Sequence, residues 1–149
     1  MKRRHFLVLT GLAAASLPAV AQRFQPAQDI APLLAKLTGG VAPEASGVEI
    51  ELPQIAENGN SVPMRVKVES PMTPADHVSA IHIIAERNPR PLVGTFHLGP
   101  NSGRAEIATR VRLAGTQKVR VLVALNDNRF RMGEVDVLVT SAACLDESL

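Results

Sequence analysis

The chain has 149 residues, of which 16 are Lys or Arg and 14 are Asp or Glu, so that its formal net charge is +2 at pH 7. It contains neither Trp nor Tyr and no block of basic residues, and this composition gives nucleic-acid binding little support. The length is that of one domain, and because aromatic residues make up only 3% of the chain, the core has to be built from Val, Ile, Leu and Ala.

The first 21 residues have the pattern of an export signal. The paired Arg3 and Arg4 precede a short apolar run, residues 8–17, which is too short to span a bilayer as a permanent helix. Ala19-Val20-Ala21 then forms a small-x-small cleavage site. The paired arginines favour the twin-arginine route, with the Sec route as the alternative. Both routes predict cleavage after Ala21, and we expect the protein in the periplasm and not in a membrane.

Cleavage at this site changes the charge of the protein. Lys2, Arg3 and Arg4 leave with the signal, so that 13 of the 16 basic residues remain against 14 acidic ones, a net charge of −1. The basic character of the full chain is therefore mostly a property of its signal.

One amphipathic helix is predicted at about residues 29–38. The apolar residues that repeat at helical spacing are Ile30, Leu33, Leu34 and Leu37. Asp29 is the predicted N-cap, and Gly39-Gly40 is expected to end the helix. Pro32 is compatible with this helix because it falls in the first turn, where its missing N–H group is not needed.

Beyond Pro43 the apolar residues alternate, and seven short strands are predicted. They cover residues 48–52, 62–68, 78–85, 92–98, 105–113, 118–125 and 130–139. Asn58-Gly59 marks a turn before the second strand. In the last strand the apolar residues Phe130 and Met132 fall at even positions, whereas Val135, Val137 and Val139 fall at odd positions. This change between the two faces of the strand predicts a β-bulge at Gly133. The pattern is typical of an all-β, immunoglobulin-like antiparallel β-sandwich, which we place at residues 22–140.

The single cysteine, Cys144, lies on a predicted flexible C-terminal tail, residues 141–149. Exported proteins usually pair their cysteines, so a lone thiol indicates either an intermolecular disulfide or a reactive group. Asp146 and Glu147 disfavour the thiolate, and no basic residue lies close in sequence. Activation would therefore have to come from the surface of a partner. An incidental thiol and a disulfide-linked dimer remain the alternatives.

Other candidate sites have weaker support. His77, His82 and His97 remain after cleavage, and His82 and His97 fall in neighbouring predicted strands, where they could meet across a sheet. No cluster supplies a third ligand by its spacing, so we interpret the histidines as structural and predict neither a metal nor a cofactor. Arg110 and Arg112 share a strand face and could bind an anion, although a solvated face is the preferred interpretation.

A series of short fragments in a fixed order runs along the mature chain. The fragments are Ile55-Ala56-Glu57-Asn58-Gly59, Val62-Pro63, Ser70-Pro71-Met72-Thr73, Ile81-His82-Ile83, Asn88-Pro89, Phe96-His97, Ser102-Gly103, Ala105-Glu106, Thr109-Arg110-Val111-Arg112-Leu113-Ala114 and Thr116-Gln117. Together with the twin-arginine start and the late cysteine, they resemble the SoxY family, the sulfur-carrier subunits of the thiosulfate-oxidising Sox system. The resemblance covers roughly the whole mature chain.

This resemblance implies a periplasmic Ig-like carrier that forms a heterodimer with the related subunit SoxZ. Cys144 would be the covalent attachment point for sulfur, on a C-terminal arm formed by residues 141–149. A c-type haem enzyme would couple thiosulfate to the thiol, a hydrolase would release sulfate, and a sulfane dehydrogenase would oxidise the remaining sulfur. The carrier itself would be no enzyme and would hold no cofactor.

The segment around Cys144 departs from the family pattern. The family's arm typically reads Gly-Gly-Cys-Gly-Gly and ends there, whereas Ala142-Ala143 precede this cysteine and residues 145–149 follow it. Glycines give an arm backbone freedom and a thin profile, and alanines reduce both. Two hypotheses follow: a covalent sulfur carrier that uses Cys144, or a non-carrier binding or assembly subunit of a Sox-like complex with a vestigial arm. An enzyme that uses the histidines is a third.

Overall fold

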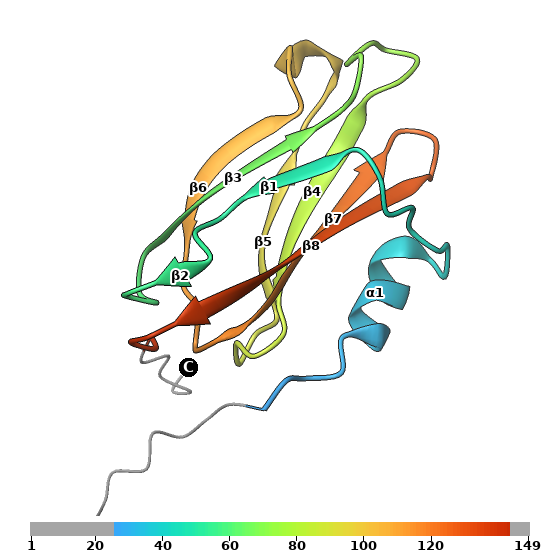
Figure 1. Ribbon diagram of the computed structural model, residues 1–149. Coiled ribbons are helices and arrows are strands. Elements are labelled where there is room, and N and C mark those ends of the chain that lie inside the picture. The colour runs from blue at the N-terminus through green and yellow to red at the C-terminus, as the bar shows by residue number, and fades with distance from the viewer. Residues whose placement is uncertain (1–25, 144–149) are drawn as a thin grey trace, which may run out of the picture.

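Two β-sheets packed face to face, with one helix on the outside, form the body of the protein (Figure 1). The computed structural model describes residues 26–143. Its elements are α1 (Ala31–Thr38), β1 (Val48–Glu51), β2 (Ile55–Ala56), β3 (Val62–Val68), β4 (Val78–Ala85), β5 (Leu92–His97), the 3-10 turn η1 (Pro100–Ser102), β6 (Glu106–Val111), β7 (Gln117–Leu125) and β8 (Phe130–Val139). One sheet has the strand order β1-β3-β6 and the other β2-β8-β7-β4-β5. The predicted Ig-like sandwich is confirmed.

Helix α1 begins slightly later than predicted. Ile30, not Asp29, occupies the N-cap position, so the predicted cap was wrong by one residue. Asp29 still provides a partner for a free backbone N–H group at the start of the helix, because its Oδ1 accepts a hydrogen bond from the N–H of Ala31 at 2.9 Å. Gly39 ends the helix in the left-handed conformation with φ 62, which confirms the predicted stop.

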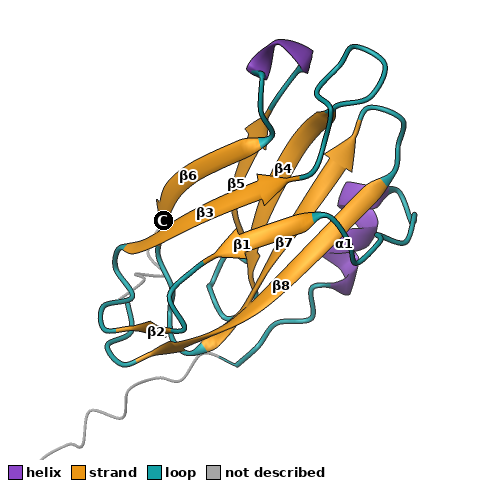
Figure 2. Cartoon of the chain, turned by 45° about the horizontal axis from the view of Figure 1, so that its top comes forward, coloured by secondary structure: helices purple, strands orange, loops and turns teal. Residues whose placement is uncertain are grey.

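The five-stranded sheet is covered on both faces, which explains its almost continuously apolar strands (Figure 2). Its inner face packs against the three-stranded sheet through fully buried residues such as Ile81, Val121 and Val66. Its outer face carries a second cluster, in which Ile84 and Leu122 pack with the apolar residues of α1. Burial of each such side chain stabilises the fold by roughly 1.5–3 kcal/mol.

The predicted bulge at Gly133 is absent, and the same two-sided coverage explains why. Strands β7 and β8 pair without a register shift, with Gly133 opposite Val121. Phe130 belongs to the outer cluster under α1, whereas Val137 belongs to the core between the sheets. The apolar residues therefore change parity because α1 covers one face of β8 near Phe130, whereas the other sheet covers the opposite face near Val137. Gly133 faces β1, where a Cβ would lie 3.1 Å from Ile50 Cδ1.

Strand β2 is the element that the sequence pattern did not predict. It has two residues and pairs in parallel with β8, Ile55 opposite Leu138. Two residues are too few to display the alternation that identifies a strand. Within residues 26–143, no helix has the length and apolar character needed to cross a membrane.

Candidate functional site

The C-terminal segment leaves the sandwich at one end, which we call the arm-side end (bottom of Figure 1). Two loops, residues 57–61 and 112–116, meet residues 140–143 there, and the loop of residues 86–91 joins residues 112–116 through Asn88. Cys144 itself, like the predicted export signal, lies outside the described residues. The described part of this site is therefore the platform from which the predicted arm departs.

The first residues of the predicted flexible tail are attached to this platform. Ser141 O accepts a hydrogen bond from the N–H of Gly59 at 2.8 Å, and the N–H of Ala143 donates to Leu113 O at 3.1 Å. Ala143 is 6% exposed, and Leu113 is fully buried. Backbone hydrogen bonds and burial therefore connect residues 141–143, the first residues of the predicted tail, to the platform.

Gly59 permits this attachment because it has no side chain. A Cβ at Gly59 would lie 2.4 Å from Leu113 O and 2.9 Å from the N atom of Ala143, closer than real Cβ atoms approach other atoms. The Asn58-Gly59 pair was predicted as a turn, and Asn58 Oδ1 does accept a bond from the N–H of Asn60 at 2.9 Å. The close approach of three backbone segments at Gly59 is a tertiary feature that the turn signal does not contain.

Asn88 joins the loops of residues 86–91 and 112–116 at the arm-side end. It is 5% exposed, and its Nδ2 donates to Arg112 O at 2.8 Å. Its Oδ1 accepts from the N–H of Ala114 at 3.0 Å and from Gln117 Nε2 at 3.1 Å. Its backbone O accepts from Gln28 Nε2, which precedes α1. The only sequence signal for this residue was its place in the Asn88-Pro89 fragment.

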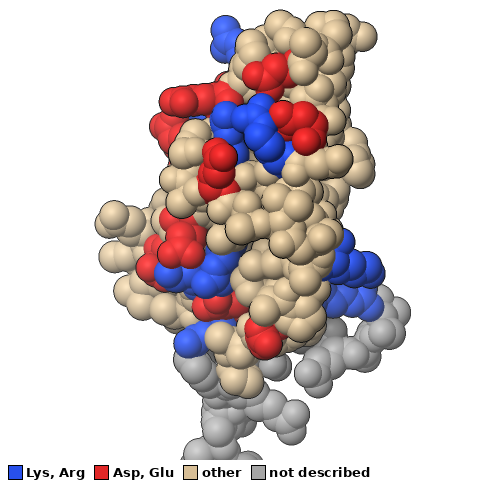
Figure 3. Space-filling view, turned by 90° about the vertical axis from the view of Figure 1, so that its right-hand side faces the viewer, with Lys and Arg blue, Asp and Glu red and all other residues tan. Residues whose placement is uncertain are grey.

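Exposed arginines lie in the loops at this end. Arg90 and Arg112 are exposed, and neither forms an ion pair with any described residue. Arg110, at the end of β6, contacts Ser61 Oγ at 3.3 Å through Nη1. On the face seen in Figure 3, several basic side chains lie beside acidic ones. The sequence had placed Arg110 and Arg112 on one strand face, and Arg90 lies in the loop that Asn88 joins to residues 112–114.

The acidic residues of the same loops are fewer. They are Glu57, which is exposed, and Glu86, which is paired with Arg120 of β7. The unpaired guanidinium groups give the arm-side end an excess of positive charge. Such an excess raises the local concentration of anions and speeds their encounter with the surface.

The two strand histidines lie together, as predicted. His82 is opposite Thr95 and His97 is opposite Ala80 on the same face of β4 and β5, and His82 Nδ1 hydrogen bonds with Thr95 Oγ1 at 2.9 Å. Burial, and secondarily the nearby His97, lower the pKa of His82. In the part of the chain that the structure describes, no three His, Cys, Asp or Glu side chains come together as a metal site.

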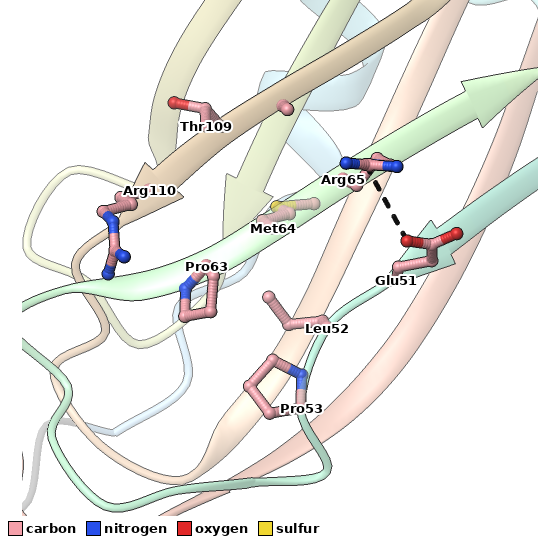
Figure 4. A pocket seen from close by; sticks show the side chains of 9 residues that line it. Glu51, Leu52, Pro53, Pro63, Met64, Arg65, Thr109 and Arg110 are labelled. Carbon is pink, nitrogen blue, oxygen red and sulfur yellow. Dashed lines mark ion pairs between the residues drawn. The ribbon is translucent and has the colours of Figure 1, made fainter.

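A hollow of about 780 Å³ lies on the outer face of the three-stranded sheet (Figure 4). The ion pair of Arg65 with Glu51, at 3.9 Å, forms part of its wall. Its lining residues include one hydroxyl, that of Thr109, and neither a histidine nor a cysteine. This set of side chains contains no pairing of a nucleophile with a base, so the hollow is a feature of the charged sheet face.

The sequence and the fold have counterparts among known proteins. The family model of sulfur oxidation protein SoxY matches residues 34–144. The superoxide reductase (neelaredoxin) from Ignicoccus hospitalis is similar with a TM-score of 0.56 and 16% identity, over 63% of this chain and 80% of that chain. The superoxide reductase from Nanoarchaeum equitans is similar with a TM-score of 0.54 and 11% identity, over 64% of this chain and 100% of that chain. Identities this low show a shared fold alone. No curated protein sequence matches this chain.

Proposed function

The chain belongs to the SoxY family, and on that premise we propose that it is a periplasmic covalent sulfur carrier that holds sulfur intermediates on Cys144. One observation carries this proposal: the family match extends through the whole sandwich to residue 144, the only cysteine.

The chemistry of such a carrier needs a thiolate and outside enzymes. In the loading step, the Sγ of Cys144 forms an S–S bond to the outer sulfur of thiosulfate. The thiol proton is released, and two electrons pass to a c-type haem partner. Water then cleaves the terminal sulfone in a hydrolase, which releases sulfate and leaves a persulfide on the cysteine. A sulfane dehydrogenase oxidises that sulfur, and a SoxZ-like subunit completes a heterodimer.

The charges of the arm-side end suit this chemistry. Thiosulfate and its cysteine adduct are anions, and the exposed Arg90 and Arg112 attract anions to the place from which Cys144 departs. The thiolate is the reactive form of a cysteine, and a positive surface favours the thiolate over the thiol. Asp146 and Glu147, which follow the cysteine in sequence, act in the opposite direction.

A non-carrier assembly subunit is the second candidate, and one observation favours it. Ala143 is buried and hydrogen-bonded to Leu113 in place of the glycine typical of the family's arm. A segment held in this way is suited to a structural contact. In that case the chain would contribute its Ig-like domain to a Sox-like complex, and the thiol would have no role in turnover.

Intact mass spectrometry of the protein from its native periplasm, without reductant, tests the carrier function. We expect sulfane or thiosulfonate adducts on the wild type and none on Cys144→Ser. We also expect the measured mass to be that of a mature chain that begins at Gln22. In a reconstituted system Cys144→Ser should abolish sulfur-dependent turnover, while Ser141→Ala, which changes the same segment without touching the thiol, should retain it. Full turnover of Cys144→Ser would favour the assembly subunit instead.

A further inference from the structure

We propose that residues 141–143 form a latch that fixes the point from which Cys144 departs, and that Gly59 is the positioning residue that closes it. The latch is defined by two hydrogen bonds, from the N–H of Gly59 to Ser141 O and from the N–H of Ala143 to Leu113 O. The functional meaning of the latch rests on the carrier role of Cys144, although the latch itself does not.

The latch is a closed ring of backbone bonds. Gly59 donates to Ser141 at 2.8 Å and accepts from the N–H of Leu113 at 2.8 Å, and Leu113 O in turn accepts from the N–H of Ala143 at 3.1 Å. The two loops that contain Gly59 and Leu113 are far apart in sequence, and they hold residues 141–143 between them. Because Leu113 is fully buried, the ring is fixed to the core of the sandwich.

Space at the centre of the ring allows only glycine. The Cβ of any other residue at position 59 would meet Leu113 O at 2.4 Å, the N atom of Ala143 at 2.9 Å and Val139 Cγ1 at 3.1 Å. The first two contacts are with backbone atoms, which cannot turn aside as a flexible side chain does. A methyl group added at position 59 would therefore have to push the loop of residues 57–61 away from residues 141–143.

The latch determines how far the thiol reaches. With the latch closed, only one residue of chain length, about 3.8 Å between Cα atoms, separates Cys144 from its last attached neighbour, Ala143. Opening the latch releases residues 141–143, which adds up to about 10 Å of extended chain. A partner with a deep active site therefore has to replace two backbone bonds before it can draw the thiol fully in, whereas a shallow site can act on the closed form.

Hydrogen exchange and alkylation of Cys144 by iodoacetamide test the latch, and neither needs a sulfur substrate or a partner. In the full mature chain, Gly59→Ala should speed exchange of the Ala143 amide by about tenfold. It should also raise the alkylation rate of Cys144 severalfold. Gly115→Ala is the matched control, because Gly115 lies in a neighbouring loop with nothing within 4 Å of its Cβ position. We expect the control to leave both rates unchanged.

A second variant keeps the test decisive if Gly59→Ala fails to fold. Ala143→Pro removes the donor to Leu113 O, and it adds its two extra ring carbons to the attached segment and none at the Gly59 junction. We expect faster alkylation of Cys144 with the thermal midpoint of the domain unchanged, a combination that a purely structural role does not produce. Alkylation at the wild-type rate in Ala143→Pro would overturn the latch. Retained turnover of Cys144→Ser would overturn the carrier function and leave the latch standing.

Discussion

The outer face of the three-stranded sheet and the arm-side end both carry charged side chains, but they use them differently. On the sheet face, Lys67 of β3 pairs with Glu51 of β1 at 2.5 Å, and Arg65 pairs with Glu106 of β6 at 3.7 Å. At the arm-side end, Arg90 and Arg112 form no ion pair with described residues. The first region neutralises itself, whereas the second keeps its charge available to another molecule.

The two regions also differ in what holds them together. Exposed ion pairs contribute little to stability, because solvent and salt screen them. The loops of the arm-side end are joined instead by the buried amides of Asn88 and Gln117 and by backbone bonds at Gly59. Neutral buried groups thus hold the loops together, and Arg90 and Arg112 form no ion pair with described residues that would compete with an anion.

The largest effect on stability is expected from Asn88→Ala. This change leaves Arg112 O and the N–H of Ala114 without their partner in a buried setting, so the free energy of unfolding should fall by about 2–3 kcal/mol. Urea unfolding followed by circular dichroism measures it. Asn58→Ala is the control, because Asn58 is exposed and makes one local turn bond. Equal losses in the two variants would remove the distinction between the buried amide network and an ordinary turn.

A smaller effect is expected on the reactivity of Cys144 when the positive charge is reversed. Arg112→Glu should slow the reaction of the thiol with the anionic disulfide DTNB severalfold at low ionic strength, because it removes attraction and adds repulsion. The reaction with neutral iodoacetamide should change less, and 0.5 M salt should abolish the difference. Arg104→Glu makes the same charge change next to η1, outside the loops of the arm-side end. An equal effect of Arg104→Glu would show that net charge, and not the arm-side end, is responsible.

His82 adds a pH dependence to the sheet that carries the arm-side loops. Burial and His97 hold its pKa below the ordinary value of 6.5, so the unfolded chain binds more protons than the folded one in that range. Stability should therefore be complete above about pH 6.5 and decline as the pH falls toward the lower folded pKa. His82→Gln should flatten this decline in melting curves between pH 7.5 and 5.5. A matched His77→Gln variant that flattens it equally would assign the effect to another histidine.

The sequence predicted the parts of this structure that depend on local periodicity. The helix stop at Gly39 and the seven longer strands follow from spacing that neighbouring residues share. The bulge at Gly133 was wrong because one strand is covered by the other sheet at one end and by α1 at the other, and parity alone does not distinguish this from an inserted residue.

The platform of the candidate site could not be predicted in the same way. Asn88 bonds to Arg112, 24 positions away in the chain, and Gly59 bonds to Ser141. A polar residue before a proline and a glycine after an asparagine have the same sequence signal whether they form a surface turn or a buried junction. Cys144 was predicted from its rarity, and this stays a prediction, whereas the attachment of residues 141–143 is a tertiary contact.

The smallest effect is expected on the sheet face, and it completes the comparison. Glu51 has its pKa lowered by the hydrogen bond from Lys67, and Lys67 has its pKa raised by the same bond. A lowered carboxylate pKa stabilises the fold above the unfolded pKa of Glu51, and this contribution is lost as the pH falls through the folded value. Both side chains are largely exposed, at 38% for Lys67 and 47% for Glu51, so screening leaves little of it. Lys67→Met should therefore leave the urea midpoint unchanged within error at 0.15 M salt, and produce a shift only at low ionic strength. A loss of unfolding free energy comparable to that of Asn88→Ala would mean that the ion pairs hold the sheet together. The two regions would then not differ in how they are stabilised.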